Sequence, residues 1–441
     1  MVLAAAAEMV WEIWQLDVQT AFLNAPVEEE VYVKMAPGYE ENDPTTGVPL
    51  VMKLLKSLYG LRQLPLNWWN TIDNFLEEIG FTSLASDPCV YAYIDNNNRT
   101  SDSHGKTVST ALRCRKVAAL LTLYVDDVLL VGRDKAVLET LKGKLMARFK
   151  MTDMGDVSLV LGMRVTRDRK NGTLTINQDN YTKSILEKYG MGDCNPLSTP
   201  GAGAELSLNQ PEEQLLDPAA KKRYQAITGS LIYLAQVTRY DIQFAVNQLA
   251  RAMSKPSKAH MGAAKHLLRY LAASTSFDIT YRKGGLKLTA FSDANWGNNP
   301  DNGKSMSSYI IMLSNAPVSF KVGMQSLTAQ STMEAELVAA ALTMKEAVLC
   351  SNMMMELGFG DVFRSVPVHI DNTSTLHVAG NSTYSGRTKH VALRYFFIRE
   401  LIKKRRITLH YVGTAKNVAD IGTNHLGKQR HHHLLNANQD L

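Results

Sequence analysis

The feature that most constrains this 441-residue sequence is a pair of aspartates inside an intensely apolar segment, VAALLTLYVDDVLLVG, residues 117–132. This composition predicts two buried strands that meet at Asp126 and Asp127. Because Asp favours turns, an ordinary hairpin turn is one interpretation. We favour a cation site, since adjacent carboxylates at the ends of buried strands repel each other until a divalent ion neutralises them. Neither neighbour is the Gly or Asn typical of tight hairpins.

A third acid, Asp17, ends the apolar run in QLDVQTAFL, residues 15–23, which predicts a strand leading into a turn and a helix. Taken alone, Asp17 is equally well explained as a helix cap. Three carboxylates on neighbouring strands would form a two-metal site for in-line phosphoryl transfer. One ion would activate the attacking oxygen and the other would stabilise the leaving oxygen.

A second set of acids lies later in the chain. Asp293 ends the apolar run LKLTAFSDA, Glu336 lies in the helical run MEAELVAAA, Asp371 ends PVHIDN and Asp420 opens VADIGTN. Each acid by itself could be a cap or a surface residue, but the ordered set indicates a carboxylate cluster over a sheet that holds Mg²⁺. Glu334 lies on a different helix face from Glu336, so only one of the two can point inward.

Composition narrows the class of protein. Hydrophobic residues make up 45% and charged residues 20%, which excludes a disordered chain, a collagen-like fibre and a disulfide scaffold. We expect no membrane-spanning helix, because no uncharged apolar run approaches the required length of about 18 residues. The four cysteines lie far apart and predict reduced thiols in an intracellular protein. A net charge of +6 permits a polyanionic partner.

The pattern along the chain predicts a multidomain protein of α/β and α+β type. Residues 1–195 begin with an Ala-rich helix that packs on the neighbouring segments, then mix strands and helices, and TRDRKNGTLTI predicts a hairpin. Residues 196–276 contain a Pro- and Gly-rich linker and then an all-helical connector. Residues 277–441 predict an α/β domain in the order strand–strand–strand–helix–strand–helix–strand, beginning with FDITYR.

These segments resemble the Pol polyproteins of copia-type LTR retrotransposons over essentially the whole chain. LDVQTAFLN, LYGLRQLPLNWW, LYVDDVLLVG, LGMRV, TGSLIYLA, TRYDI, AVNQLARAMSKP and HLLRYL resemble the reverse transcriptase. SDANW, STMEAELVAA, HIDN, SGRTKHVALRYFFIRE and NVADI resemble the RNase H domain that succeeds it. The resemblance implies a reverse-transcriptase palm and thumb, a helical connector and an RNase H-like α/β domain.

The resemblance also implies roles for individual residues. It makes Asp17, Asp126 and Asp127 the polymerase carboxylates, and Asp293, Glu336, Asp371 and Asp420 the nuclease carboxylates, with two Mg²⁺ ions per site and Mn²⁺ as the alternative ion. Phe22 corresponds to an aromatic gate against the ribose 2′-OH, or is a core residue. Gln63 corresponds to a nucleotide and template contact, or is a surface polar residue. His390 corresponds to a phosphate contact, or is structural.

Some positions depart from the family pattern. The family has a preceding fingers subdomain that holds the incoming triphosphate, whereas this chain starts just before Asp17. Leu66 stands where the family has a basic residue, and Ala392 and Phe396 stand where it often has Asp and His. We therefore expect a truncated polymerase half with impaired activity, beside a nuclease half that keeps its carboxylates.

The implied function is that of an enzyme, an RNA-directed DNA polymerase with ribonuclease H activity. Its partners would be an RNA template, a DNA primer, dNTPs and an RNA–DNA hybrid, in the cytoplasm, the nucleus or a virus-like particle. Two basic clusters could bind phosphates or could be solvated helix faces: Lys255, Lys258, Lys265 and Arg269, and Arg399, Lys403, Lys404, Arg405 and Arg406. The alternatives are a decayed or host-retained relic that only binds nucleic acid, and a protein that keeps the nuclease alone.

Overall fold

The computed structural model describes residues 1–440 apart from residues 28, 59, 95–116, 202, 204–205 and 381–391. The chain divides into two compact units. The smaller unit contains Trp11–Val157 and Glu356–Gly358. The larger unit contains Met1–Val10, Ser158–Met355 and Phe359–Leu441. The boundaries that we predict at residues 195/196 and 276/277 stay predictions.

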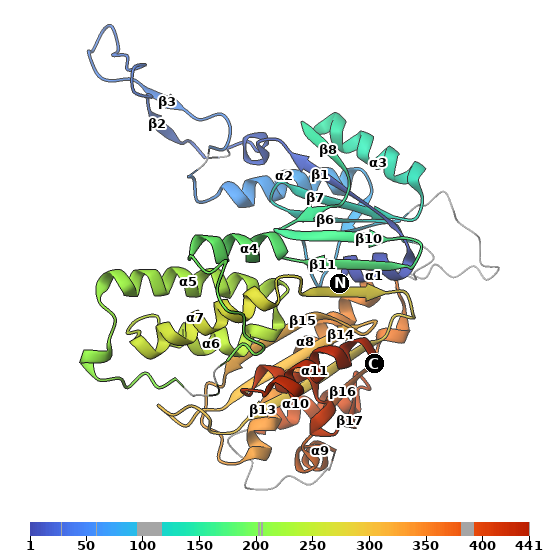
Figure 1. Cartoon of the computed structure of the whole chain (residues 1–441). Helices are drawn as coiled ribbons and strands as arrows, with labels where there is room; N and C mark the ends of the chain where they lie inside the picture. Colours follow the sequence, from blue (N-terminus) through green and yellow to red (C-terminus); the bar gives the residue numbers. More distant parts are fainter. Residues whose placement is uncertain are drawn as a thin grey trace, which may run out of the picture. The chain divides into compact units, whose positions relative to one another are not determined.

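The smaller unit is built on a six-stranded antiparallel sheet in the order β4-β5-β6-β7-β1-β8 (Figure 1). Its strands are β1 (Glu12–Val18), β4 (Phe81–Ser83), β5 (Val90–Ile94), β6 (Val117–Tyr124), β7 (Asp127–Gly132) and β8 (Met151–Asp156). The predicted pair of apolar strands is therefore confirmed as β6 and β7, which pair with each other.

Two helices cover one face of this sheet, α2 (Leu64–Glu78) and α3 (Lys135–Arg148). Trp68, Ile72 and Leu76 recur every four residues along α2 and are buried in the core, as expected for one face of a helix with 3.6 residues per turn. Alternate residues of the strands, such as Leu16 and Val18 in β1, point into the same core. The apolar pattern of these segments thus fixes which side of each strand faces the helices.

A separate two-stranded ribbon, β2 (Tyr32–Lys34) and β3 (Val51–Lys53), extends away from the six-stranded sheet (Figure 1). It comes after a short 3₁₀ helix, Ala21–Asn24, that directly succeeds β1. The strand, turn and helix predicted around Asp17 are confirmed by this succession, although the helix has only four residues.

The larger unit contains a four-stranded antiparallel sheet in the order β12-β11-β10-β9. Its strands are β9 (Leu159–Val160), β10 (Met163–Asp168), β11 (Thr173–Asn177) and β12 (Asp278–Arg282). The predicted hairpin is confirmed as β10 and β11, and its turn includes Gly172, whose φ of 62° suits a residue without a side chain.

The pairing of β12 corrects one prediction. FDITYR was expected to be the first strand of the C-terminal α/β domain, but β12 pairs with β11, about a hundred residues earlier in the chain. An apolar run shows that a segment is a strand, whereas its pairing partner depends on the tertiary fold.

The N-terminal helix α1 (Val2–Met9) belongs to the larger unit and contacts β11 and β12. The Glu8 carboxylate accepts hydrogen bonds from the backbone N–H groups of Gly284 and Gly285, at 2.9 and 3.0 Å. The first helix is thus attached to a segment 276 residues further along the chain.

Four helices form a bundle in the larger unit: α4 (Asp179–Lys188), α5 (Pro218–Val237), α6 (Gln243–Arg251) and α7 (Lys258–Ala273). Asp217 and Pro218 start α5, since the Asp carboxylate accepts from two backbone N–H groups and Pro fits the first helical turn. Ser257 and His260 form a capping box at the start of α7. The predicted all-helical stretch and the irregular linker before it are both confirmed.

The C-terminal part of the larger unit contains a five-stranded sheet in the order β15-β14-β13-β16-β17. The strands are β13 (Leu288–Asn295), β14 (Met306–Leu313), β15 (Ala316–Met324), β16 (Val366–Ile370) and β17 (Ile407–Tyr411). β13, β14 and β15 are antiparallel, and β16 and β17 continue the sheet in parallel with β13. Three strands precede α8 as expected, but they are β13, β14 and β15, and the third of these was not predicted.

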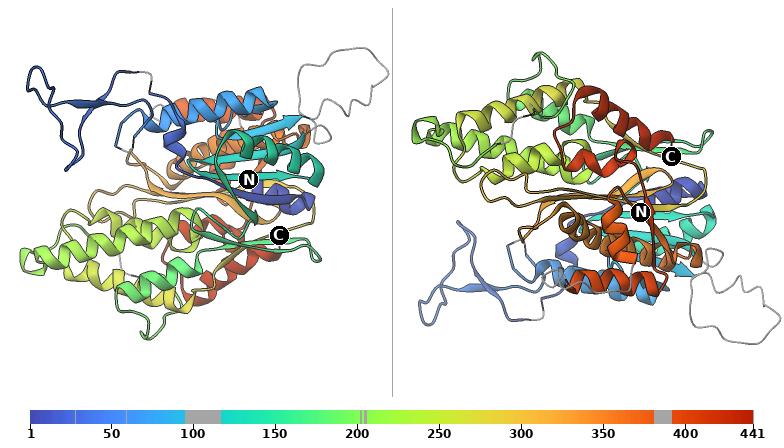
Figure 2. Two further views of the ribbon diagram at one scale, coloured as in Figure 1. Left: turned by 90° about the horizontal axis from the view of Figure 1, so that it is seen from above. Right: turned by 90° about the horizontal axis from the view of Figure 1, so that it is seen from below.

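The helices of this part are α8 (Thr332–Glu356), α9 (Thr373–Gly380), α10 (Ala392–Lys403) and α11 (Lys428–Asp440). Figure 2 shows α8 to α10 on one side of the strands and α11 on the other. By length and composition alone α8 could cross a membrane, but 61% of its most apolar window is buried inside the protein. Among the described cysteines, Cys89, Cys194 and Cys350 are free thiols, and Cys114 lies outside the described residues.

Candidate active sites

The acids Asp17, Asp126 and Asp127 lie at one end of the central strands of the smaller unit. β1 pairs with β7 in a register that places Asp17 opposite Asp127. Across the hairpin Tyr124 pairs with Asp127, so Val125 and Asp126 form a two-residue turn. The structure therefore gathers these three carboxylates on neighbouring strands.

The turn that carries Asp126 has an unfavourable backbone conformation. Val125 has a φ of 57°, in the left-handed region that β-branched residues rarely adopt. The indole Nε1 of Trp68 donates to the carbonyl oxygen of Val125 at 2.6 Å, and the backbone N–H of Val18 donates to that of Asp126 at 2.9 Å. Because both carbonyl groups of the turn are bound by neighbouring elements, these contacts hold the conformation that valine alone disfavours.

The three carboxylates differ in exposure. Asp126 is exposed, whereas Asp17 and Asp127 are half-buried. Burial raises the pKa of Asp127, the charges of Asp126 and Asp17 raise it further, and a long hydrogen bond from Gln15 Nε2, at 3.4 Å, opposes these effects. In the described part of the chain, the acids whose ligand atoms converge within 4.8 Å are those of the other cluster, and not these three.

Phe22 and Gln63 lie in short segments of the smaller unit. Phe22 lies in the 3₁₀ helix after β1 and packs, half-buried, against the hydrophobic core. Gln63 is half-buried and immediately precedes α2, without capping that helix through its side chain. Leu66, in the first turn of α2, is 59% exposed. The roles of Phe22 and Gln63 in nucleotide binding stay predictions.

The strain at Val125 gives a test of the turn. Val125→Ala keeps a Cβ that the left-handed conformation disfavours by about 1 kcal/mol, whereas Val125→Gly removes it. We expect the glycine variant to melt at the same or a higher temperature than the alanine variant, by calorimetry of the full chain. Inside a helix a glycine variant is normally less stable than an alanine variant. We therefore expect Val137→Gly in α3 to melt at a lower temperature than Val137→Ala. If Val125→Gly also melts at a lower temperature than Val125→Ala, the left-handed conformation does not strain Val125 and the prediction is contradicted.

The second cluster lies where the parallel pairing of β13 with β16 ends. Ser292 in β13 pairs with Ile370 in β16, so the next residues lie side by side: Asp293, which is still within β13 and pairs with β14, and Asp371, which comes directly after β16. Glu336 reaches them from α8, and its Oε1 accepts a hydrogen bond from the backbone N–H of Ala294 at 3.3 Å. One ligand oxygen from each of the three acids lies within 4.8 Å of the others.

Neighbouring side chains fix Asp293. Its Oδ1 accepts a hydrogen bond from Asn417 Nδ2 at 3.2 Å, and its Oδ2 accepts a short one from Thr423 Oγ1. Both donors come from the segment that contains Asp420. We did not predict them, although both flank Asp420 in NVADIGTN, and that proximity in sequence was the available signal.

Asp420 is buried beside this cluster, but it is not among the acids whose oxygens converge. Its Oδ1 accepts a hydrogen bond from Asn424 Nδ2 at 2.6 Å, and its Oδ2 accepts one from Arg430 Nε at 2.8 Å. Sequence analysis also missed these two partners, because nothing in the pattern around Arg430 pointed to the acids.

The electrostatics of the cluster fit a bound cation. Burial raises the pKa of Asp293 and of Glu336 well above the ordinary range, and the charges of the neighbouring acids raise both further. Glu336 Oε2 is buried and has no hydrogen-bond partner within the described residues. An ion bound by the three acids would pair this oxygen and offset the repulsion, and carboxylate oxygens are the ligands that Mg²⁺ and Mn²⁺ prefer.

Glu334 has a different environment from Glu336. It is also buried, but its Oε2 accepts a hydrogen bond from the backbone N–H of Gln330 at 2.8 Å, just before α8 begins. The structure therefore brings Glu336, and not Glu334, to the other acids, while Glu334 stabilises the start of the helix. His390 lies outside the described residues.

The repulsion in this cluster predicts how stability depends on pH in the absence of metal. Since the folded-state pKa values of Asp293 and Glu336 are raised, their stabilising contribution is complete below about pH 4, the unfolded value, and is lost as the pH rises through the folded values. Asp371→Asn removes one repelling charge. We expect it to stabilise the metal-free chain by about 1 kcal/mol at pH 8 and by nothing at pH 4.

Thermal unfolding of wild type and Asp371→Asn in EDTA, from pH 4 to pH 8, measures this difference. Added Mg²⁺ should reverse the order at pH 8, because the wild type then gains a ligand-bound state that the variant binds less well. A difference between the two proteins that stays constant with pH would contradict the prediction.

Comparison with known proteins identifies the family. Residues 1–202 match the family of reverse transcriptases (RNA-dependent DNA polymerases). The chain is 34% identical over 427 residues to the retrovirus-related Pol polyprotein from transposon TNT 1-94 of Nicotiana tabacum. It is 32% identical over 429 residues to that from transposon RE1 of Arabidopsis thaliana. The chain belongs to the copia-type retrotransposon Pol family.

These alignments include 96% and 97% of the copia-type chain, but 30% and 27% of the two polyproteins. The chain thus spans under a third of the length of these relatives. Among solved structures, it is similar to a foamy viral protease-reverse transcriptase in complex with double-stranded DNA, with a TM-score of 0.50 and 11% identity. The match covers 91% of this chain and 57% of that one, and it confirms the predicted mixed α/β fold.

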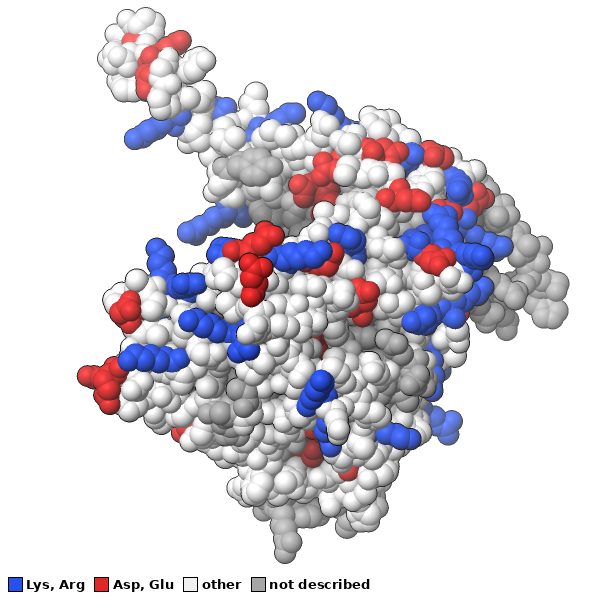
Figure 3. Space-filling model, in the orientation of Figure 1, with Lys and Arg blue, Asp and Glu red and all other residues white. Residues whose placement is uncertain are grey.

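The basic residues of the copia-type chain differ in what they contact. Lys255, Lys258 and Lys265, in and before α7, are exposed. In the second cluster Arg406 donates to Asn352, whereas Lys404 forms an exposed ion pair with Glu400. On the face shown in Figure 3, basic and acidic side chains are interspersed. The exposed lysines on α7 are therefore candidates for phosphate contacts, as are Lys403 and Arg405 of the second cluster.

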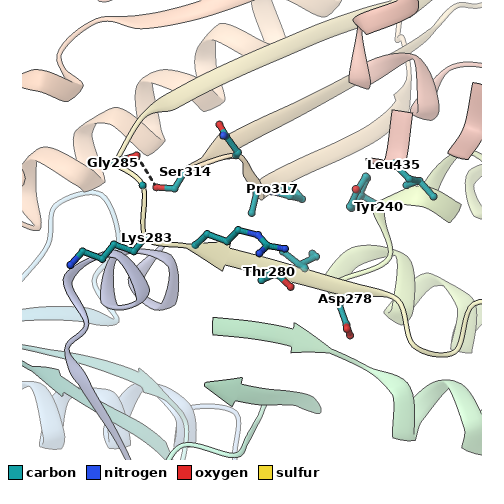
Figure 4. A pocket seen from close by; sticks show the side chains of 13 residues that line it. Tyr240, Asp278, Thr280, Lys283, Gly285, Ser314, Pro317 and Leu435 are labelled. Carbon is teal, nitrogen blue, oxygen red and sulfur yellow. Dashed lines mark hydrogen bonds between the residues drawn. The ribbon is translucent and has the colours of Figure 1, made fainter. Parts of the chain in front are cut away.

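A cavity of about 470 Å³ lies between β12 and the turn joining β14 to β15 (Figure 4). Its lining includes Thr280 and Lys283 on one side and Ser314 and Pro317 on the other. None of the seven candidate acids lines this cavity. The chemistry that we assign to the carboxylates therefore does not involve it.

Proposed function

We propose that the copia-type chain hydrolyses the RNA strand of RNA–DNA hybrids at Asp293, Glu336 and Asp371, with Asp420 as the fourth carboxylate. The observation that carries this proposal is the convergence of three acid oxygens within 4.8 Å, one of the acids having a buried oxygen without a partner among the described residues. Four-ligand sets of this kind hold two divalent ions in enzymes that hydrolyse phosphodiesters.

The residues of the chain supply position and charge. Mg²⁺ ions, or Mn²⁺ as the alternative, would activate the attacking water and stabilise the leaving oxygen. Asn417 and Thr423 orient Asp293 through its two oxygens, and the backbone N–H of Ala294 orients Glu336. The exposed lysines of α7 would hold the hybrid by its phosphates, so binding should weaken as the salt concentration rises.

Cleavage of a labelled RNA–DNA hybrid by the full chain in Mg²⁺ tests the proposal. We expect Asp371→Asn to lower the rate by at least about a hundredfold, because it removes a ligand while keeping the shape of the side chain. Folding should persist, as shown by an unchanged circular dichroism spectrum. Cleavage by the double variant Asp293→Asn, Asp371→Asn would overturn the assignment.

Glu334→Gln is the matched control, because Glu334 is also a buried glutamate and lies two residues from Glu336 on the same helix. Its carboxylate bonds to Gln330 and does not face the other acids, so we expect a nearly unchanged cleavage rate. Glu336→Gln should abolish cleavage. The reverse result would show that the wrong face of α8 has been assigned to the site.

We also infer a second site of nucleotidyl transfer in the smaller unit, at Asp17, Asp126 and Asp127. The cross-strand pairing of Asp17 with Asp127 next to the turn at Asp126 supports it. Its substrates would be dNTPs, a DNA primer and an RNA template, with Phe22 and Gln63 near the nucleotide. Because the ligand atoms of these acids do not converge within 4.8 Å, the site would have to rearrange before it holds two ions.

This difference predicts unequal activities in one preparation. We expect primer extension on an RNA template to be weak relative to hybrid cleavage by the same chain, because phosphoryl transfer depends on prior positioning of the reacting groups. Rapid incorporation of dNTPs that Asp126→Asn abolishes would contradict this expectation. Salt-sensitive hybrid binding with neither activity would favour the alternative, a nucleic-acid-binding relic. We place either role inside the cell, in the cytoplasm, the nucleus or a virus-like particle.

A further inference from the structure

Asp420 already has partners for both of its oxygens. Arg430 donates to Oδ2 from Nε at 2.8 Å, and its Nη2 lies 2.7 Å from the same oxygen. Asn424 Nδ2 donates to Oδ1 at 2.6 Å. Arg430 therefore occupies Oδ2 with one hydrogen bond and a second close nitrogen, and Asn424 occupies one of the two lone pairs of Oδ1.

The other three acids are in a different state. Asp293, Glu336 and Asp371 each offer an oxygen to a common point, and Glu336 Oε2 is buried without a partner among the described residues. Asp420 is buried close enough for its charge to raise the pKa values of Asp293 and Glu336, yet it is not part of the convergent group. The site is thus prepared for an ion at three acids, while the fourth is paired with an arginine.

Arg430 is itself held from two directions. Its Nη2 also donates to the carbonyl oxygen of Thr414 at 3.0 Å. The next residue, His431, is 1% exposed, and its Nε2 lies 3.0 Å from the hydroxyl of Tyr270 in α7. That hydroxyl donates to the buried carboxylate of Asp241. The first turn of α11 is therefore anchored to the helical bundle, which fixes the backbone at Arg430 beside Asp420.

We propose that Arg430 is a positioning residue. By keeping Asp420 paired with its guanidinium, it makes the second metal ion of this site bind more weakly than the first. The inference rests on the proposed nuclease function. The first ion binds Asp293, Glu336 and Asp371. The second ion needs Asp420, and it gains that ligand only as Arg430 withdraws to its remaining partner, the carbonyl of Thr414.

The direction of the effect is set by charge. Arg430 and a divalent cation compete for the same carboxylate, and a guanidinium beside the site also repels the incoming ion. Removing Arg430 should therefore tighten the second ion and leave the first nearly unchanged. An arginine that merely oriented Asp420 for metal binding would give the opposite result, because its loss would weaken the second ion.

The test is a titration of the full chain with Mn²⁺, in which electron paramagnetic resonance measures the free ion. All proteins carry Asp126→Asn and Asp127→Asn, so that the smaller unit contributes no site. We expect two dissociation constants in the reference protein. Arg430→Gln should lower the dissociation constant of the second ion by about tenfold and leave that of the first ion within a factor of two. Arg430→Lys, which keeps the charge but not the paired donors, should give an intermediate second constant.

Lys428→Gln is the matched control, because it removes one positive charge from the same helix turn at an exposed position. If Lys428→Gln and Arg430→Gln shift the second constant equally, or if Arg430→Gln weakens it, the proposal is overturned. Melting temperatures check that every variant is folded. The double variant Asp293→Asn, Glu336→Gln should abolish binding of the first ion. Should both ions persist in that variant, the proposed nuclease site fails, which is a separate outcome from failure at Arg430.

Discussion

Repulsion between neighbouring carboxylates is the constraint that shapes both acidic sites of this chain. In the larger unit, Asp293 in β13 and Asp371 just after β16 lie next to the last parallel pair of these two strands, and Glu336 joins them from α8. The negative charges of these acids repel one another and so oppose this arrangement. It persists because the apolar residues of β13 and β16 are buried in fixed register, and that burial stabilises the sheet by more than the acids destabilise it. Burial of the hydrophobic core thus maintains a repulsion between the acids that a bound cation would relieve.

The two acidic sites solve this problem differently. At the β6–β7 turn Asp126 is exposed, so that water screens its charge, Asp17 and Asp127 are half-buried, and a further cost appears in the backbone of Val125. In the larger unit Asp293, Glu336 and Asp420 are buried and Asp371 is half-buried, and the cost is electrostatic. A buried site excludes water and holds its ligands closely, whereas an exposed turn leaves room for a long substrate. Each arrangement agrees with the reaction that we propose for it.

Periodicity in the sequence predicted most of the elements and the acids at their ends. The apolar runs located β6, β7, β13 and β16, and the helical period separated Glu336 from Glu334, because residues two apart lie on different faces. Contacts between distant segments were not predictable in this way. The pairing of β12 with β11 and the arginine on Asp420 both depend on tertiary packing, which no local pattern encodes. Short α9 was missed because eight residues give little periodic signal.

The attachment of α1 to the segment after β12 has a consequence for synthesis on the ribosome. Glu8 cannot accept its hydrogen bond from Gly284 until 276 more residues have been synthesised. At about 5–20 residues per second this takes roughly 15–55 seconds. Once β11 (Thr173–Asn177) has been made, the β9–β11 sheet has an unpaired outer edge until β12 (Asp278–Arg282) is made. Helices α4 to α7 form locally within this interval and shorten the loop that must close. The nascent chain therefore depends on its own helical bundle to bring its two most distant partners together before another chain binds the open edge.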